Sequence, residues 1–184
     1  AYGQGVSTLS ACDGVTLVGQ GQEVARPNCA RAALFRTTAA DFMRDPAMRH
    51  EIFGPVSLLV SYSSEAELHA LTESLEGQLT ITLQMDDDDM AHARALLPIF
   101  ERKAGRILVN AWPTGVEVCH AMVHGGPFPA TTDARTTSVG TGAISRFLRP
   151  VCYQDLPDAL LPPELAYDNP LGLSRLVDGT MQTR

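Results

Sequence analysis

The fold is decided by residues 56–110, which read VSLLVSYSSEAELHALTESLEGQLTITLQMDDDDMAHARALLPIFERKAGRILVN. Three runs rich in Val, Leu and Ile stand in this stretch, at Val56–Tyr62, Leu79–Met85 and Arg106–Asn110, and each has the length of a buried strand. Two segments with helical signals separate them. Strands that alternate with helices in this way are typical of a parallel sheet with right-handed crossovers.

Both helical segments carry recognisable start signals. The first begins at Ser64 and Glu67, which form a capping-box pair, and Gly77 supplies its stop. The second begins in the four aspartates 86–89, whose negative charge suits the start of a helix. It contains Pro98, which we expect to kink or interrupt it because proline lacks the N–H of the helix ladder.

Two earlier apolar runs, Val15–Val18 and Ala32–Thr38, extend the strand pattern towards the start of the chain. The runs show little polar alternation, which favours a sheet covered on both faces. We therefore predict the α/β class, with a mostly parallel sheet and crossover helices. The stretch after Asn110 has no clear period, and long loops of this kind are usually functional or disordered.

Composition narrows the class of protein. The 184 residues are 45% hydrophobic and 19% charged, as in a soluble globular domain, and no apolar run is long enough to span a membrane. The net charge of −7, with 14 scattered Lys and Arg, predicts no nucleic-acid partner. The four cysteines form no C-x-x-C pair, so we expect reduced thiols in a cytoplasmic protein.

Metal binding has two candidates, and neither is favoured. The aspartates 86–89 offer the oxygen ligands that Mg²⁺ or Ca²⁺ prefers, but consecutive aspartates before a helix are more typical of a solvated helix start. Cys119, His120 and His124 resemble part of a zinc set without its fourth ligand. A cysteine hydrolase with Cys119 as nucleophile stays open, since its histidine base has to come from elsewhere in the fold.

The motif Glu51-Ile52-Phe53-Gly54-Pro55 stands at the mouth of the strand that begins at Val56, and α/β proteins usually bind ligands at strand mouths. Followed by GQLTITLQ and AGRILVNAWPTGVEV, it resembles the C-terminal part of the catalytic domain of the aldehyde dehydrogenase superfamily. The loop that starts at Trp112 is similar to that of the 2,5-dioxovalerate (α-ketoglutarate semialdehyde) dehydrogenases. That loop has Pro-Phe-Pro-Ala at residues 127–130, where most relatives have Pro-Phe-Gly-Gly.

The resemblance implies roles for five residues. Glu51 would bind the hydroxyls of the nicotinamide ribose and Phe53 would lie beside the nicotinamide ring of NAD or NADP. Trp112, Pro113 and Phe128 would contact the aldehyde substrate. Without the resemblance, Glu51 could equally cap a turn, and Trp112 could belong to the core.

The resemblance also implies a domain plan. Residues 1–146 would be part of the catalytic domain, 147–155 a strand that joins a partner subunit in a homo-oligomer, and 156–184 a C-terminal tail. No catalytic residue is predicted, because the family's Gly-Gln-x-Cys motif is missing. The pairs Gly3-Gln4 and Gly19-Gln20 have no cysteine two positions after the glutamine.

We therefore expect a C-terminal fragment of an NAD(P)-dependent enzyme that oxidises a semialdehyde to the acid. Its partner would be the missing N-terminal part of the same enzyme, and the fragment alone would be inactive. The alternative is a non-catalytic binding or assembly module that retains the fold.

Overall fold

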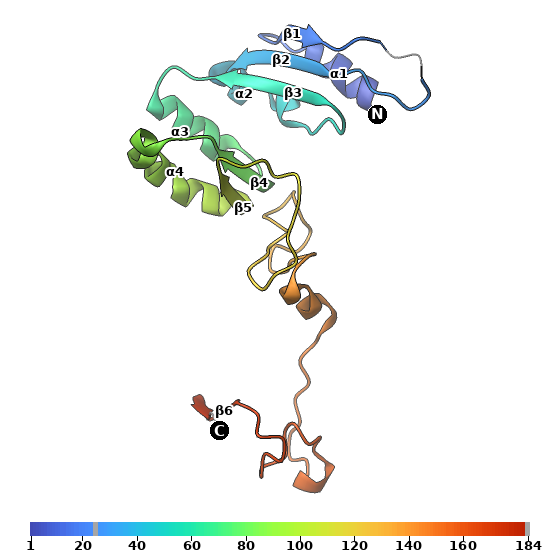
Figure 1. The fold of residues 1–184 in the computed structure, drawn as a ribbon, viewed down its shortest axis with the longest axis vertical. Coiled ribbons are helices and arrows are strands. Elements are labelled where there is room, and N and C mark those ends of the chain that lie inside the picture. The colour runs from blue at the N-terminus through green and yellow to red at the C-terminus, as the bar shows by residue number, and fades with distance from the viewer. Residues whose placement is uncertain (24–25, 183–184) are drawn as a thin grey trace. The chain divides into compact units, whose positions relative to one another are not determined.

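The structure is a computed structural model, and it describes residues 1–23 and 26–182. The chain divides into two compact units, Ala1–Arg146 and Phe147–Arg184 (Figure 1). Each unit is described by itself.

The first unit begins with a three-stranded sheet. Strand β1 (Thr16–Gln20) runs antiparallel to β2 (Ala33–Thr38), and β2 runs parallel to β3 (Val56–Ser61). Helix α1 (Tyr2–Ser10) precedes the sheet, and α2 (Ala39–Arg44) connects β2 to β3 together with a 3₁₀ turn, η1 (Pro46–Arg49), that contains Met48. The sequence analysis predicted the strands and missed both helices.

The second half of the unit repeats the strand-and-helix alternation. Helix α3 (Glu65–Ser74) leads to β4 (Gln78–Leu83), and α4 (Met90–Lys103) leads to β5 (Ala104–Val109). Strands β4 and β5 are parallel neighbours. The α/β class with parallel strands is thus confirmed.

The expected single sheet is wrong for this chain. Strand β3 pairs with β2 and β4 pairs with β5, but β3 and β4 are not hydrogen-bonded to each other, so the described residues of this unit hold two separate sheets (Figure 1). The expectation that the sheet is covered on both faces is also wrong. Side chains of β2 and β3 alternate in burial, because helices cover only one face of their sheet and leave Arg36 and Leu59 exposed on the other.

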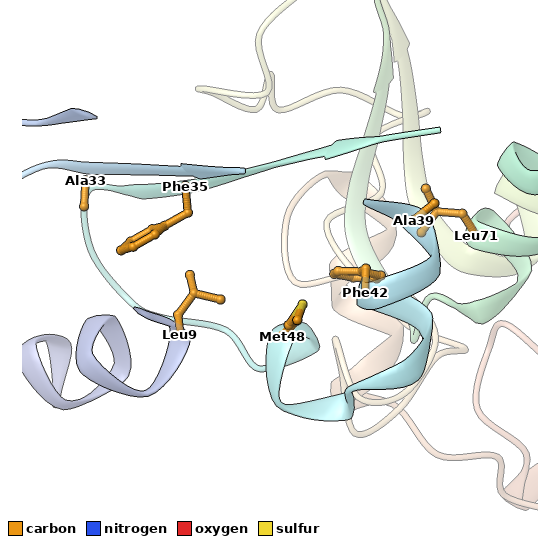
Figure 2. Close-up of a cluster of buried hydrophobic side chains, with 7 residues drawn as sticks. All are labelled: Leu9, Ala33, Phe35, Ala39, Phe42, Met48 and Leu71. Atoms are coloured by element: carbon orange, nitrogen blue, oxygen red, sulfur yellow. The ribbon is translucent and has the colours of Figure 1, made fainter. Parts of the chain in front are cut away.

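The larger core lies beneath the first sheet. Figure 2 shows its seven buried side chains, which come from helices α1 to α3, the η1 turn and β2: Leu9, Ala33, Phe35, Ala39, Phe42, Met48 and Leu71. Phe35 is 1% exposed and lies at the strand position that faces these helices. A smaller cluster of Leu96, Ile99 and Phe100 joins α4 to β4 and β5.

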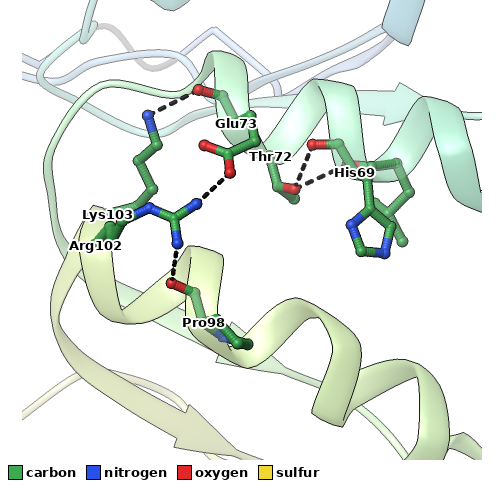
Figure 3. Close-up of polar contacts among 7 residues, drawn as sticks. His69, Thr72, Glu73, Pro98, Arg102 and Lys103 are labelled. Atoms are coloured by element: carbon green, nitrogen blue, oxygen red, sulfur yellow. Dashed lines mark hydrogen bonds and ion pairs between the residues drawn. The ribbon is translucent and has the colours of Figure 1, made fainter.

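Helices α3 and α4 are joined by polar contacts (Figure 3). The guanidinium of Arg102 binds the carboxylate of Glu73, and the ammonium of Lys103 donates to the Glu73 carbonyl oxygen at 2.7 Å. Arg102 also donates to the carbonyl oxygen of Pro98 at 2.7 Å. Helix α4 runs through Pro98 as one helix, so Pro98 does not interrupt it, and the expected kink stays a prediction.

Both helix starts use the side chains that the sequence indicated. The Ser64 hydroxyl accepts from the Glu67 N–H at 3.2 Å, while the Glu67 carboxylate accepts from the N–H and hydroxyl of Ser63 at 2.6 and 2.7 Å. The Asp86 carboxylate accepts from the Asp88 N–H, and the last aspartate of the run accepts from the Asp86 N–H. The aspartates therefore form a capped 3₁₀ turn, η2 (Asp87–Asp89), that leads into α4, whose own N-cap residue Asp89 makes no side-chain cap hydrogen bond.

Helix α3 ends at Ser74, capped by Leu75, so it stops before Gly77. Gly77 has a packing reason instead: a Cβ built there would lie 2.2 Å from the carbonyl oxygen of Pro127. The loop after β5 is irregular up to a 3₁₀ helix at Thr141–Phe147, as expected for its aperiodic sequence.

The second unit is mostly irregular. Residues 147–155 form no strand within the described chain, where they have no hydrogen-bonded strand neighbour, and their pairing with a partner subunit stays a prediction. A short antiparallel hairpin of β6 (Arg175–Val177) and β7 (Thr180–Gln182) lies instead in the expected tail. Among the residues that the structure describes, no helix is long and apolar enough to cross a membrane.

Candidate active-site wall

The segment between η1 and β3 is held against helix α1 through alternate residues. Ile52 packs on the helix so closely that a Cβ on Gly5 would lie 2.9 Å from its Cγ2. Gly54 has a φ of +153°, and a Cβ there would lie 2.3 Å from the Tyr2 ring. The Tyr2 hydroxyl donates to the carbonyl oxygen of Pro55 at 3.2 Å. Glycine is therefore required at 54 by both conformation and space.

Glu51 and Phe53 alternate with these anchors and are exposed. The Phe53 side chain is 88% exposed, and Glu51 is exposed as well. The hydrogen bonds and ion pairs of the described residues include none from the Glu51 carboxylate, so the alternative that it caps a turn is wrong. The segment thus exposes a carboxylate and an aromatic ring on the same side of its backbone alternation.

A shallow cavity of about 450 Å³ adjoins this segment. Glu51 and Phe53 line it together with His50, Met48 and Leu58. Because the segment precedes β3, the cavity lies at the amino end of that strand. The general rule of α/β proteins, in which ligands bind beyond the carboxyl ends of strands, therefore does not explain its place. His50 is a polar lining residue that the sequence analysis did not single out; its only signal was the position next to Glu51.

The three residues expected to contact substrate are exposed but not brought together. Trp112 is 79% exposed, which contradicts its alternative role in the core, and Pro113 is exposed beside it. Both follow the carboxyl end of β5, where the Asn110 N–H bonds the last residue of β4. Phe128, also 79% exposed, lies at the opposite end of the two strands, because its carbonyl oxygen approaches Gly77 just before β4.

The histidines of the long loop bind hydroxyl groups. Nδ1 of His124 lies 3.0 Å from the Ser138 hydroxyl, and Nδ1 of His120 lies 3.0 Å from the Thr141 hydroxyl. Cys119 is a free, half-buried cysteine, and the hydrogen bonds among the described residues include none between its Sγ and a histidine. These contacts give the histidines a structural role and give Cys119 no oriented base.

Charge in the loop is locally paired. The Arg135 guanidinium lies 3.0 Å from Asp133, and this hydrogen bond lowers the pKa of the Asp133 carboxyl. Within residues 1–23 and 26–182, no group of three or more His, Cys, Asp or Glu side chains is arranged to hold a metal ion.

Comparison with known proteins identifies related enzymes. No protein-family model matches the chain. It is 57% identical over 180 residues to alpha-ketoglutaric semialdehyde dehydrogenase 2 of Azospirillum brasilense, a match that covers 97% of this chain and 34% of that enzyme. It is 47% identical over 182 residues to alpha-ketoglutaric semialdehyde dehydrogenase of Acinetobacter baylyi, covering 98% of this chain and 35% of that enzyme.

Solved structures show the same fold at low sequence identity. The Delta-pyrroline-5-carboxylate dehydrogenase of Mycobacterium tuberculosis superposes with a TM-score of 0.61 at 15% identity, over 86% of this chain and 30% of that one. Betaine aldehyde dehydrogenase of Staphylococcus aureus, solved in complex with NAD⁺, gives 0.53 at 14% identity, over 77% and 27%. The chain thus spans about a third of the length of the curated relatives that it matches. By sequence the 184 residues therefore correspond to about one third of two curated α-ketoglutaric semialdehyde dehydrogenases, and by fold they match part of solved aldehyde dehydrogenases.

Proposed function

We propose that this chain forms one wall of the active site of an NAD(P)-dependent aldehyde dehydrogenase, as the C-terminal part of that enzyme. The observation that carries the proposal is the outward presentation of Glu51 and Phe53 from a segment anchored on α1. The names of the two curated relatives support α-ketoglutaric semialdehyde as the substrate, and the S. aureus structure with NAD⁺ supports a nicotinamide cofactor.

The two residues fit the nicotinamide half of such a cofactor. An ionised carboxylate without a protein partner can accept hydrogen bonds from both hydroxyls of a ribose. An exposed phenyl ring offers a flat apolar surface to a planar ring. When bound, the cofactor supplies the hydride acceptor, and the role of Glu51 and Phe53 is to fix its orientation.

Exposed side chains near the carboxyl end of β5 support a substrate contact by Trp112 and Pro113. Phe128 belongs to the same proposal as an exposed aromatic residue of the same loop, although it lies at the other end of the strand pair. The nucleophile and the base that the oxidation needs are assigned to the rest of the enzyme. We therefore expect no turnover from the 184-residue chain alone.

Two broader assignments complete the proposal. The enzyme would be a homo-oligomer in which residues 147–155 pair with a partner subunit, since they are exposed and lack a strand neighbour in this chain. Four free cysteines support a reducing, cytoplasmic location.

The test is reconstitution with a matched pair of variants. The chain is co-produced with the part of the A. brasilense enzyme that it does not match, and reduction of NAD and of NADP is followed by absorbance with α-ketoglutaric semialdehyde. Glu51→Gln should lower kcat/KM by about 10- to 100-fold, because a misplaced cofactor slows hydride transfer. Glu101→Gln changes an exposed carboxylate on α4 and should leave kcat/KM unchanged.

Three results would contradict the proposal. Turnover by the isolated chain would show that the chain carries its own nucleophile. A reconstituted enzyme in which Glu51→Gln and Glu101→Gln behave alike would remove Glu51 from the cofactor site. A complex that forms but never turns over would favour the non-catalytic module.

A further inference from the structure

The long loop after β5 returns to the amino end of that strand and lies against it backbone to backbone. A Cβ built on Gly105, the second residue of β5, would lie 2.6 Å from the carbonyl carbon of Gly125 and 3.0 Å from the Cα of Gly126. Both loop glycines are buried. Because the atoms in contact belong to the backbone of the loop, no side chain could move aside to admit a Cβ at position 105.

The next residues of the loop make the same kind of contact with the start of β4. A Cβ on Gly77 would lie 2.5 Å from the carbonyl oxygen of Phe128 and 2.6 Å from the carbonyl carbon of Pro127. In the other direction, a Cβ on Gly126 would press on the carbonyl oxygen of Gln78, the first residue of β4. Residues on both sides of this contact therefore have to be glycine.

Gly77, Gly105 and Gly126 are called here the glycine seat of the loop. None of the three has the left-handed backbone that favours glycine, so the requirement is one of space. Interiors are close-packed, and a methyl group added at the seat has to displace the loop from the strands.

Hydrogen bonds close the turn that the seat holds. The Ala130 N–H donates to the carbonyl oxygen of Pro127 at 2.9 Å, and the Thr131 hydroxyl donates to the carbonyl oxygen of Gly126 at 2.6 Å. The backbone of the turn is thus fixed on the side of the strands. The Phe128 side chain projects from the same turn and is 79% exposed.

We propose that the glycine seat and Thr131 are positioning residues, which fix the Phe128 ring as one wall of the substrate site. The inference rests on the proposed function, because that function gives Phe128 its contact with the aldehyde. A displacement of about 1 Å in a group that orients a substrate can cost about 100-fold in rate. A seat that acts only through Phe128 affects use of the aldehyde and spares binding of the cofactor.

The first test uses the enzyme reconstituted from this chain and the part of the A. brasilense enzyme that it does not match. With α-ketoglutaric semialdehyde, Gly77→Ala should lower kcat/KM for the aldehyde by about 10- to 100-fold. The KM for the nicotinamide cofactor should change by less than about twofold. Gly19→Ala is the matched control, since it adds the same methyl group where nothing lies within 4 Å, and it should leave both constants unchanged.

A milder variant tests the same turn if Gly77→Ala fails to fold. Thr131→Val keeps the shape of the side chain and removes its hydrogen bond to the Gly126 carbonyl oxygen. It should lower kcat/KM for the aldehyde by about 3- to 10-fold. Thr132→Val changes an exposed hydroxyl next to it and should have no effect.

A double-mutant cycle asks whether these residues act through the Phe128 ring. Phe128→Ala alone should lower kcat/KM for the aldehyde. In that background, Gly77→Ala and Thr131→Val should cause little further loss, because residues that act through one group are not additive.

Amide hydrogen exchange of the 184-residue chain gives a readout that needs no turnover. The Ala130 amide, which is bonded to Pro127, should exchange about tenfold faster in Gly77→Ala than in the unchanged chain. In Gly19→Ala its exchange should not change.

The outcomes separate this inference from the proposed function. Unchanged kcat/KM in Phe128→Ala contradicts the substrate contact of the proposed function, and the positioning role with it. A loss in Phe128→Ala to which the losses of Gly77→Ala and Thr131→Val simply add overturns the positioning role alone. Equal losses for aldehyde and cofactor overturn it in favour of a purely structural role. Ala130 exchange that Gly77→Ala does not alter overturns it as well, because the loop has then not moved.

Discussion

The ring of Tyr2 lies against Gly54, and its hydroxyl lies 3.2 Å from the carbonyl oxygen of Pro55, 53 residues along the chain. This relationship fixes the segment that carries Glu51 and Phe53 to the first helix. The residues proposed to position the cofactor are therefore coupled to the packing of α1, and the coupling can be tested at Gly54.

Gly54→Ala should destabilise the chain by about 1–3 kcal/mol, because alanine is strained at a φ of +153° and its Cβ would meet the Tyr2 ring. Urea unfolding measures the change. In the background of Tyr2→Ala the cost should shrink but not vanish, since only the steric part is relieved. Equal costs in the two backgrounds would show that the ring does not restrict position 54.

Phe35→Ala should cost about 3–5 kcal/mol of unfolding free energy, because the side chain is 1% exposed among the helices beneath the first sheet. Phe53→Ala is the matched control, since the same atoms are removed from a side chain that is 88% exposed. Its effect on stability should lie within about 0.5 kcal/mol. Similar losses at both positions would contradict the assignment of the core.

The carboxyl of Glu67 at the start of α3 should make the stability of the chain depend on pH. Hydrogen bonds from the Ser63 N–H and hydroxyl lower the pKa of Glu67 below its ordinary 4.5. A carboxyl with a lowered folded-state pKa contributes stability above its unfolded pKa and loses it as the pH falls through the folded pKa. The measured free energy of unfolding should therefore decrease as the pH is lowered below about 4.5. Glu67→Gln should remove that part of the slope, and an unchanged slope would exclude Glu67 as its source.

Thiol labelling tests the remaining hydrolase hypothesis. Cys29 and Cys152 are exposed, so iodoacetamide should modify them first. Cys12 should react slowly, because burial, followed by its contact with Asp45, raises the pKa of its thiol. Mass spectrometry of digested samples gives the order. Fastest labelling at Cys119 would revive a nucleophilic role for that residue.

Trp112 is the single tryptophan and therefore a reporter of the long loop. In the isolated chain its emission should be that of a water-exposed indole, open to quenching by acrylamide, because 79% of the side chain is exposed. Adding the unmatched part of the A. brasilense enzyme should shift the emission to shorter wavelength and reduce quenching. If the complex forms and the fluorescence does not change, Trp112 lies outside the surface at which the two parts meet.

Local patterns predicted the individual elements well. The apolar runs and capping residues located β2 to β5 and both longer helices to within two or three residues, since these signals act over one or two turns. The same reasoning missed α1 and α2. Helix α1 carries two glycines and no acidic residue in its first turn, and α2 is only six residues long. The hairpin of β6 and β7 has strands of three residues, too short for a periodic pattern.

The sequence predicted which motif forms the candidate site, but not how its side chains are arranged in space. The letters EIFGP indicated Glu51 and Phe53, but their exposure depends on the packing of Ile52 and Gly54 on α1, a helix that the sequence analysis did not predict. The family resemblance predicted that Trp112 and Phe128 contact the same substrate. The structure sets their backbones at opposite ends of the same strand pair because the loop returns along β5, where Arg106 donates to the carbonyl oxygen of Gly115 at 2.8 Å.

By itself, the sequence determined strands β2 to β5, helices α3 and α4, the caps before them, and the motif that is proposed to face a ligand, because all of these follow from neighbours within a few residues. For the residues that the structure describes, only the tertiary structure decided that β3 and β4 do not pair, that one face of the first sheet is uncovered, and that residues 147–155 lack a strand neighbour. Pairing and burial depend on what lies across the strand edge or above the sheet face, and that information comes from residues far away in the chain.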